Sequence, residues 1–158
     1  MDLREHSQAF QQVTDRVSAV SVAVDEAMAI GDTRCVARDF LASLQAVHGL
    51  PVSERASGMV QLVVTELVTN ARKYAPGPCL LSLEACEGGV AVSVWDSCTV
   101  MPLILPPDPA RIGQHGLEIV TAVCRSFEVH REPVGKRVRA VLTLADDPGG
   151  AAAGRQLL

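Results

Sequence analysis

Residues 60–75 read VQLVVTELVTNARKYA, and the way this stretch folds constrains the rest of the chain. Its apolar residues recur every three to four positions, which predicts an amphipathic helix with one face in a core. Ser53 opens this helix and Ala75-Pro76-Gly77-Pro78 stops it, so we expect a helix over 53–74. Glu66 and Asn70 fall one turn apart, at the border between the apolar and polar faces.

The helix alone leaves two interpretations of Glu66 and Asn70 open. In the first, both residues only edge a solvated face, as polar residues at a helix border usually do. In the second, they line a site beside the core, where partial desolvation keeps a carboxylate basic enough to act as a general base. The amide oxygen would then suit Mg²⁺, which binds hard oxygen ligands together with waters and phosphates.

The segments around this helix are expected to form a further set of strands and helices. The predicted elements are, in chain order, a strand over 18–24, a helix over 32–47 with Asp32 as N-cap, the helix over 53–74, strands over 79–86 and 90–96, a proline-rich loop over 99–112, a helix over 117–125, and a hairpin of 127–131 with 137–144 around Val134-Gly135. Antiparallel strands with helices between them predict an α+β fold, built as a two-layer sandwich.

The composition narrows the class of protein. The 158 residues suit one domain, which we expect at 18–145, with an extension at 1–17 and a flexible tail at 146–158. The net charge of −4 comes with no basic patch, so no nucleic-acid partner is expected. No apolar run approaches the roughly 20 residues of a membrane span. Five cysteines without a C-x-x-C pair favour reduced thiols in the cytoplasm, without a zinc site or disulfides.

Two further features could carry chemistry. Asp96 ends a predicted strand on the face that Val92 and Val94 share, where a carboxylate needs a donor. It could form a cap or an Asx turn, or accept a bond from an exocyclic amine such as that of adenine. Gly113 and Gly116 stand where a loop enters a helix, which is either simple turn chemistry or a phosphate site made by free backbone N–H groups.

Taken in order, these motifs resemble the GHKL (Bergerat-fold) ATPase superfamily. Residues 66–75, ELVTNARKYA, are similar to its N box, residues 94–97, VWDS, to its G1 box, and residues 113–120, GQHGLEIV, to its G2 box. The pattern is similar above all to the small anti-sigma regulatory-factor serine/threonine kinases, including the ATP-binding proteins of streptomycete type. The resemblance covers residues 18–144 and implies a mixed, mostly antiparallel sheet with helices on one face.

The resemblance also implies ATP and Mg²⁺ as cofactors, and a role for each matching residue. These roles are Glu66 as general base, Asn70 as Mg²⁺ ligand, Asp96 as the acceptor of the adenine amine, Gly113 and Gly116 as phosphate contacts, and Lys73 as an additional contact to a phosphate or to the metal shell. Two departures matter: Cys98 replaces the glycine of the usual Asp-x-Gly, and the loop at 99–112 lacks a glycine-rich lid.

The function expected from the resemblance is an ATP-dependent serine/threonine protein kinase that regulates transcription by partner switching. Its partners would be an anti-sigma-factor antagonist, a sigma factor or both, with a homodimer left open. The alternative is a nucleotide-binding regulatory module that sequesters a partner without significant turnover. A simple ATPase is a third class. The intact Glu66 favours chemistry, whereas the altered G1 box and lid favour the alternative.

Overall fold

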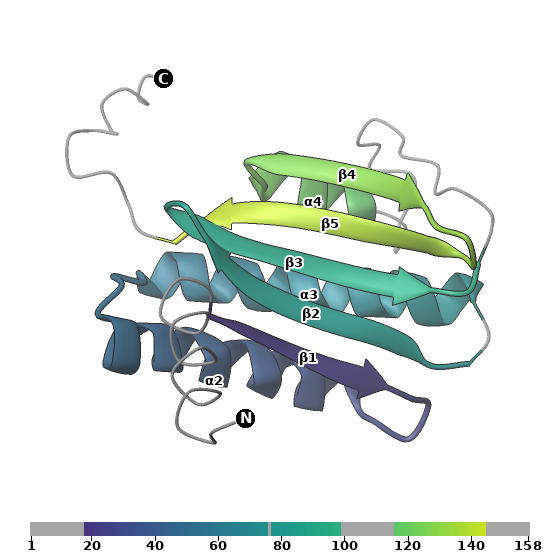
Figure 1. Cartoon of the computed structure of the whole chain (residues 1–158), viewed down its shortest axis with the longest axis horizontal. Coiled ribbons are helices and arrows are strands. Elements are labelled where there is room, and N and C mark those ends of the chain that lie inside the picture. Colours follow the sequence, from purple (N-terminus) through teal and green to yellow (C-terminus); the bar gives the residue numbers. More distant parts are fainter. Residues whose placement is uncertain (1–17, 76, 99–115, 145–158) are drawn as a thin grey trace, which may run out of the picture.

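The computed structural model of the chain describes residues 18–75, 77–98 and 116–144; the expected extension at 1–17 and tail at 146–158 lie outside them. The described residues form five strands and three helices, in the order that the sequence predicts. These elements are β1 (Ala19–Val24), α2 (Ile30–His48), α3 (Glu54–Tyr74), β2 (Cys79–Cys86), β3 (Gly89–Asp96), α4 (Gly116–Val123), β4 (Ser126–Arg131) and β5 (Lys136–Thr143) (Figure 1). None of the helices in this described part of the chain is long and apolar enough to cross a membrane.

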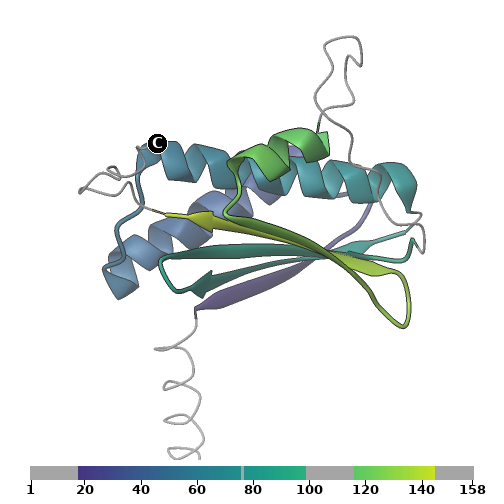
Figure 2. The same ribbon diagram turned by 90° about the horizontal axis from the view of Figure 1, so that it is seen from above.

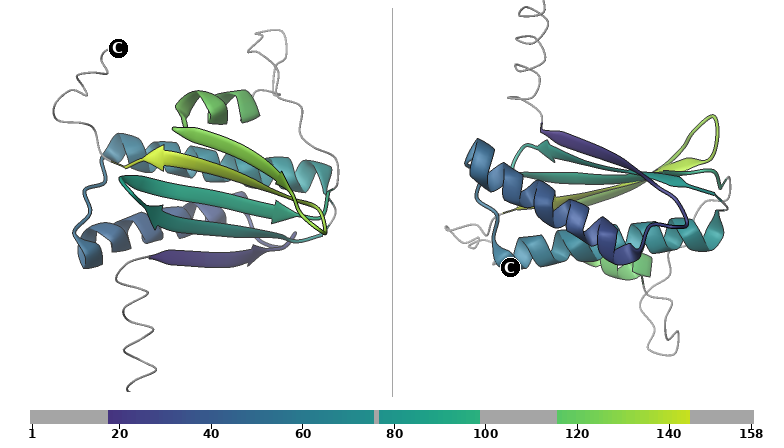
Figure 3. Two further views of the ribbon diagram at one scale, coloured as in Figure 1. Left: turned by 45° about the horizontal axis from the view of Figure 1, so that its top comes forward. Right: turned by 90° about the horizontal axis from the view of Figure 1, so that it is seen from below.

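The strands form one sheet in the order β1-β2-β3-β5-β4, and every neighbouring pair is antiparallel. All three helices lie on the same face of this sheet, as Figures 2 and 3 show from two sides. The arrangement confirms the predicted α+β two-layer sandwich with helices on one face. β3 lies at the centre of the sheet, so the residue that ends it is close to several other elements.

The start of α2 differs from the prediction, because Asp32 is not its N-cap. The helix begins at Ile30, after Ala29, and Asp32 lies inside the first turn. The Asp32 carboxylate accepts the Ala29 backbone N–H at 3.1 Å, which satisfies one of the amide groups that a helix start leaves free. The helix ends at His48, one residue after the predicted end, and Gly49 follows it in a left-handed conformation with φ 65°.

The amphipathic pattern of α3 places its apolar face against the sheet. The Ser53 hydroxyl accepts the Ala56 N–H at 3.0 Å and caps the helix start, as predicted. The buried residues of the helix are Ala56, Val60, Val63, Val64, Leu67, Val68 and Ala71. Burying each Val or Leu side chain stabilises the fold by about 1.5–3 kcal/mol, so this face determines the rotation of the helix. Glu66 and Asn70 consequently lie at the edge of the buried face.

The turn between β4 and β5 packs closely against the end of β3. Gly135 in this turn has φ 81°, and a Cβ atom there would lie only 1.7 Å from the Asp96 carbonyl oxygen. A residue with a side chain does not fit this position, so the predicted Val134-Gly135 turn needs its glycine. The close approach sets the register of the two strands, in which Lys136 lies directly opposite Asp96.

Candidate functional site

Two half-buried polar side chains, Glu66 and Asn70, lie at the edge of α3 next to the core. Val63 and Leu67 on the same helix are 0% and 2% exposed, which shows how close the core is. Within the described part of the chain, no hydrogen bond or ion pair engages the Glu66 carboxylate or the Asn70 amide. This edge of α3 can therefore offer a carboxylate and an amide oxygen to a ligand without breaking an existing contact.

The last turn of α3 carries two basic side chains in different surroundings. Arg72 donates to the backbone carbonyls of Asp25, at 2.7 Å, and Met28, so it ties α3 to the connection between β1 and α2. Lys73 is exposed, with its Nζ atom 5.3 Å from the centre of the Tyr74 ring. Seven residues separate Lys73 from Glu66, which places both on one side of the helix, two turns apart. Lys73 is therefore the basic group of this turn that is free to approach a phosphate.

Asp96, by contrast, is fully engaged by other groups of the chain. Its two carboxylate oxygens accept hydrogen bonds from Lys136 Nζ at 3.0 and 2.9 Å. The backbone N–H of Cys98 donates to Asp96 Oδ1 at 2.8 Å, which is the Asx-turn contact that the sequence left open. Both charged side chains are 2% exposed. Asp96 lies on the buried face as predicted. The hydrogen-bond donors that it needs there are groups of the chain itself.

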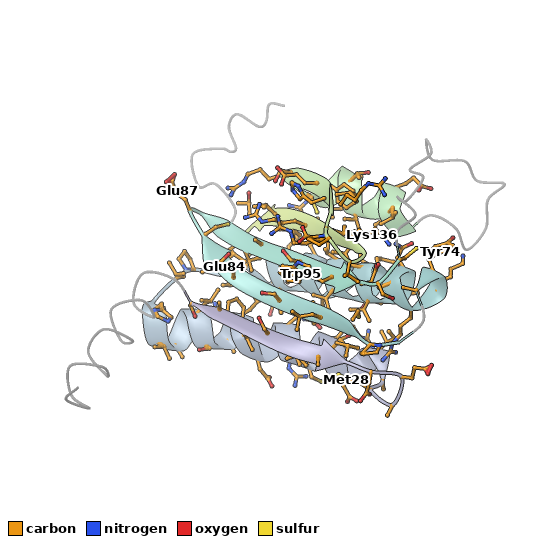
Figure 4. All side chains as sticks on the ribbon, turned by 45° about the vertical axis from the view of Figure 1, so that its right-hand side comes forward. Met28, Tyr74, Glu84, Glu87, Trp95 and Lys136 are labelled. Atoms are coloured by element: carbon orange, nitrogen blue, oxygen red, sulfur yellow. The ribbon has the colours of Figure 1, made fainter. Side chains whose placement is uncertain are left out.

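Lys136 is a site residue that the sequence interpretation missed. It begins β5, whereas the predicted strand began one residue later, at Arg137. A signal was present, because Lys136 has the same parity as the buried residues Val138 and Ala140 and therefore faces the helices. Figure 4 shows Lys136 at the same end of the molecule as Tyr74, the last residue of α3. The end of the predicted site at which adenine would bind thus contains a buried ammonium group.

The energies involved favour the ion pair over a ligand contact. Removing one partner of a buried ion pair typically costs about 3–5 kcal/mol, because the other charge is left without compensation. One hydrogen bond to a charged group contributes about 1.5–3 kcal/mol. A neutral donor on a ligand would thus gain less from Asp96 than the separation of Asp96 from Lys136 costs.

A buried thiol lies near the ion pair. Burial raises the pKa of the Cys79 thiol, the charge of Arg72 opposes this shift, and the charge of Asp96 adds to it. The thiol is therefore in its neutral form around pH 7. It supplies no negative charge that could replace Asp96 as the partner of Lys136.

The phosphate end of the predicted site is only partly described. α4 begins at Gly116 and lies beside the middle of α3 in Figures 2 and 3, in agreement with the contacts between the two helices. A helix start leaves its first backbone N–H groups without partners inside the helix, and such groups can bind anions. Gly113 and the loop at 99–112 lie outside the described residues.

The donor set at the edge of α3 fits Mg²⁺ bound together with a nucleotide. The described residues contain no cluster of three or more His, Cys, Asp or Glu that could hold a metal ion alone. Mg²⁺ usually needs no such cluster, because it keeps several waters and binds one or two protein oxygens together with phosphate groups. Asn70 and Glu66 supply oxygens of this kind, and neither is engaged elsewhere within the described residues.

Comparison with known proteins places the chain in a family. It is similar in fold to the crystal structure of the RsbU and RsbW domains of Rv1364c from Mycobacterium tuberculosis, with a TM-score of 0.56 and 19% sequence identity. That match covers 80% of this chain and 32% of the other, so the chain spans about a third of the length of that structure. No curated protein matches the chain at a significant level. A family model described as a histidine kinase-like ATPase domain matches residues 32–142, well over half of the sequence. The chain therefore belongs to the histidine kinase-like ATPase domain family, in agreement with its resemblance to the GHKL superfamily.

Proposed function

We propose that this domain is an ATP- and Mg²⁺-dependent serine/threonine protein kinase that regulates transcription through partner switching. The observation that carries the proposal is the pair of unengaged, half-buried side chains, Glu66 and Asn70, one turn apart on α3. ATP is the nucleotide that membership of an ATPase family implies. The kinase class is supported by the motif resemblance, and by a fold shared with a structure that contains RsbU and RsbW domains.

In the proposed mechanism, each residue at the edge of α3 has one task. Glu66 accepts the proton of a partner serine or threonine hydroxyl as that oxygen attacks the γ-phosphorus of ATP, and ADP leaves with the bridging oxygen; the proton acceptance is general-base assistance. Asn70 would hold Mg²⁺ through its amide oxygen, and Mg²⁺ would supply positive charge beside the phosphates. Lys73 and the backbone N–H groups at the start of α4, from Gly116 on, attract the same phosphates. Gly113 would extend this phosphate contact.

The partners follow from the same proposal. The substrate would be an anti-sigma-factor antagonist that carries the serine or threonine, and a sigma factor would be the second binding partner, both in the cytoplasm. Two copies of the chain could also associate. In such a system nucleotide and partner binding are linked, so a ligand with different affinity for the two complexes shifts the balance between them.

One observation favours a second candidate function, a nucleotide-binding module that sequesters a partner without turnover. The carboxylate expected to recognise adenine, Asp96, is held by Lys136 and by the Cys98 amide. A site with one end closed in this way could retain a nucleotide loosely and still present a partner-binding surface. The two candidates differ in whether a phosphoryl group is transferred.

The test is incubation of the purified protein with labelled ATP, Mg²⁺ and candidate antagonists or sigma factors. The kinase proposal predicts label on a serine or threonine of an antagonist, identified by phosphopeptide mapping. Label only in free phosphate would indicate an ATPase. If ATP binds and a partner is retained but no label moves, the sequestering module is correct. Glu84→Gln is a matched control, because Glu84 is exposed on β2 away from the site.

A further inference from the structure

The Asp96 carboxylate, to which the motif resemblance assigns the adenine contact, already accepts hydrogen bonds from other groups of the protein. Lys136 donates to both carboxylate oxygens, and the Cys98 N–H donates to one of them. A carboxylate has about four acceptor positions, so three hydrogen bonds leave one, on Oδ2. Since the Asp96 and Lys136 side chains are each only 2% exposed, very little of this group faces solvent.

The exocyclic amine of adenine is a poor competitor for this carboxylate. It is a neutral donor that arrives from solution, whereas the Lys136 ammonium is a charged donor held opposite Asp96 by the register of β3 and β5. The ammonium is buried, and Asp96 is its only hydrogen-bond and ion-pair partner among the described residues, so displacing it would remove every such contact that it makes there. A buried, unpaired ammonium is strongly unfavourable.

We propose that Lys136 determines base specificity by keeping Asp96 from recognising adenine, so that this domain does not distinguish adenine from guanine nucleotides. The inference rests on the proposed function, because it concerns the same nucleotide site. Affinity then comes from the phosphate end, where Asn70 and Lys73 contact groups that ATP and GTP share. Lys136 lies outside the three motifs that carry the family resemblance, so those motifs alone do not reveal its effect on Asp96.

The experiment measures the dissociation constants of ATP and GTP by calorimetry, in Mg²⁺, for the wild type and three variants. Lys136→Ser opens the space and frees the carboxylate. Asp96→Ala/Lys136→Ser opens the same space without a carboxylate and is its matched control. Asp96→Leu/Lys136→Met keeps both volumes but removes both charges, a type of replacement that buried ion pairs usually tolerate.

The expected result is a wild type whose affinities for ATP and GTP lie within about threefold. Lys136→Ser should prefer ATP by about tenfold or more, the effect of one hydrogen bond to a charged acceptor, and the control should lose that preference. If Lys136→Ser does not fold, the Asp96→Leu/Lys136→Met variant still decides, because its ATP-to-GTP ratio should equal that of the wild type.

A different set of results overturns the inference. A wild type that prefers ATP by more than about tenfold, with the preference lost in Asp96→Leu/Lys136→Met, would show that Asp96 recognises adenine despite Lys136. That outcome leaves the proposed function intact. A wild type that binds neither nucleotide, beside a Lys136→Ser variant that binds ATP selectively, supports the inference and refutes nucleotide-dependent activity of the wild type. Absence of binding by every variant overturns both.

Discussion

The two ends of the candidate site both contain a carboxylate, but the carboxylates differ in how their hydrogen bonds are satisfied. At the edge of α3, Glu66 is half-buried and has no hydrogen-bond or ion-pair partner within the described residues, and neither has Asn70 beside it. At the end of β3, Asp96 has both oxygens bonded to a buried lysine. A motif match would assign ligand contacts to both ends. Asp96 keeps one acceptor position, on Oδ2, but its side chain is only 2% exposed, so the α3 end is the more accessible to a ligand.

The difference shows why residue type and motif position do not by themselves make a binding group. A carboxylate can accept a ligand donor only if the ligand bond is stronger than the bonds it replaces. A ligand bound to Glu66 displaces no hydrogen bond or ion pair of the described residues, whereas a ligand that takes the place of Lys136 at Asp96 leaves a buried ammonium group unpaired. Substitutions at the two ends should therefore affect different measurements, chemistry at one end and folding stability at the other.

The largest effect is expected from Glu66→Gln, which keeps the volume and removes the basic oxygen. Phosphoryl transfer should fall by about 10²–10⁴-fold, the usual contribution of general-base assistance, while ATP affinity changes only a few-fold. The measurement is the initial rate of partner phosphorylation at saturating ATP, with Glu84→Gln as the control. A Glu66→Gln protein as active as the wild type would place the base elsewhere.

Breaking the ion pair should mainly affect stability. Asp96→Ala leaves Lys136 buried and unpaired, so the free energy of unfolding should fall by about 3–5 kcal/mol. Asp96→Leu/Lys136→Met should stay near the wild type or exceed it, because no charge remains buried. Urea denaturation followed by circular dichroism tests both. If Asp96→Ala were as stable as the wild type, the pair would not be a structural contact in solution.

Asn70→Ala tests the free end for metal binding. Without its amide oxygen, the gain in ATP affinity that Mg²⁺ provides should shrink by about 10–100-fold, an effect of the size seen when metal sites lose a supporting group. The unfolding transition should stay where it is, since no described contact is lost. ATP titrations with and without Mg²⁺ measure this effect, and Thr69→Ala, an exposed neighbour, is the control. Identical Mg²⁺ responses of Asn70→Ala and wild type would remove Asn70 from the site.

The smallest effect is expected from an exposed pair of side chains joined by a hydrogen bond. Glu128 and His130 on β4 lie 2.9 Å apart, and the hydrogen bond from His130 lowers the pKa of Glu128 below its ordinary value of 4.5. Because the pKa of Glu128 is lower in the folded state, its charged form contributes to stability at pH values above the ordinary pKa. This contribution is lost as the pH falls through the pKa of the folded state. Solvent screens this pair. Glu128→Gln should therefore change stability at pH 7 far less than Asp96→Ala does.

The difference between Glu128→Gln and the wild type should disappear in acid. Urea denaturation at several pH values between 3 and 7 measures it, with the Asp96→Ala protein alongside. A loss at pH 7 that rivals the loss in Asp96→Ala would contradict the distinction between exposed and buried pairs on which the comparison rests.

Local patterns in the sequence were sufficient to predict the elements and their order. The periodicity of residues 60–75 predicted α3 because apolar side chains recur at the spacing that buries one helix face. The alternation in the strands worked for the same reason, with a period of two. The errors occur at element ends, where periodicity carries little information. Asp32 lies within the first turn of α2 instead of before it, and β5 begins at Lys136, one residue earlier than expected.

The sequence by itself therefore determined the fold class, the family resemblance and the spacing that aligns Glu66 with Asn70, because each depends on residues close together in the chain. Only the tertiary structure decided the state of Asp96. Its partner Lys136 follows 40 residues later in the chain and reaches it because β5 pairs with β3 in one particular register. The alternation within a strand indicates which side chains share a face, but which strand lies beside β3, and so which residue lies opposite Asp96, depends on how distant segments pack together.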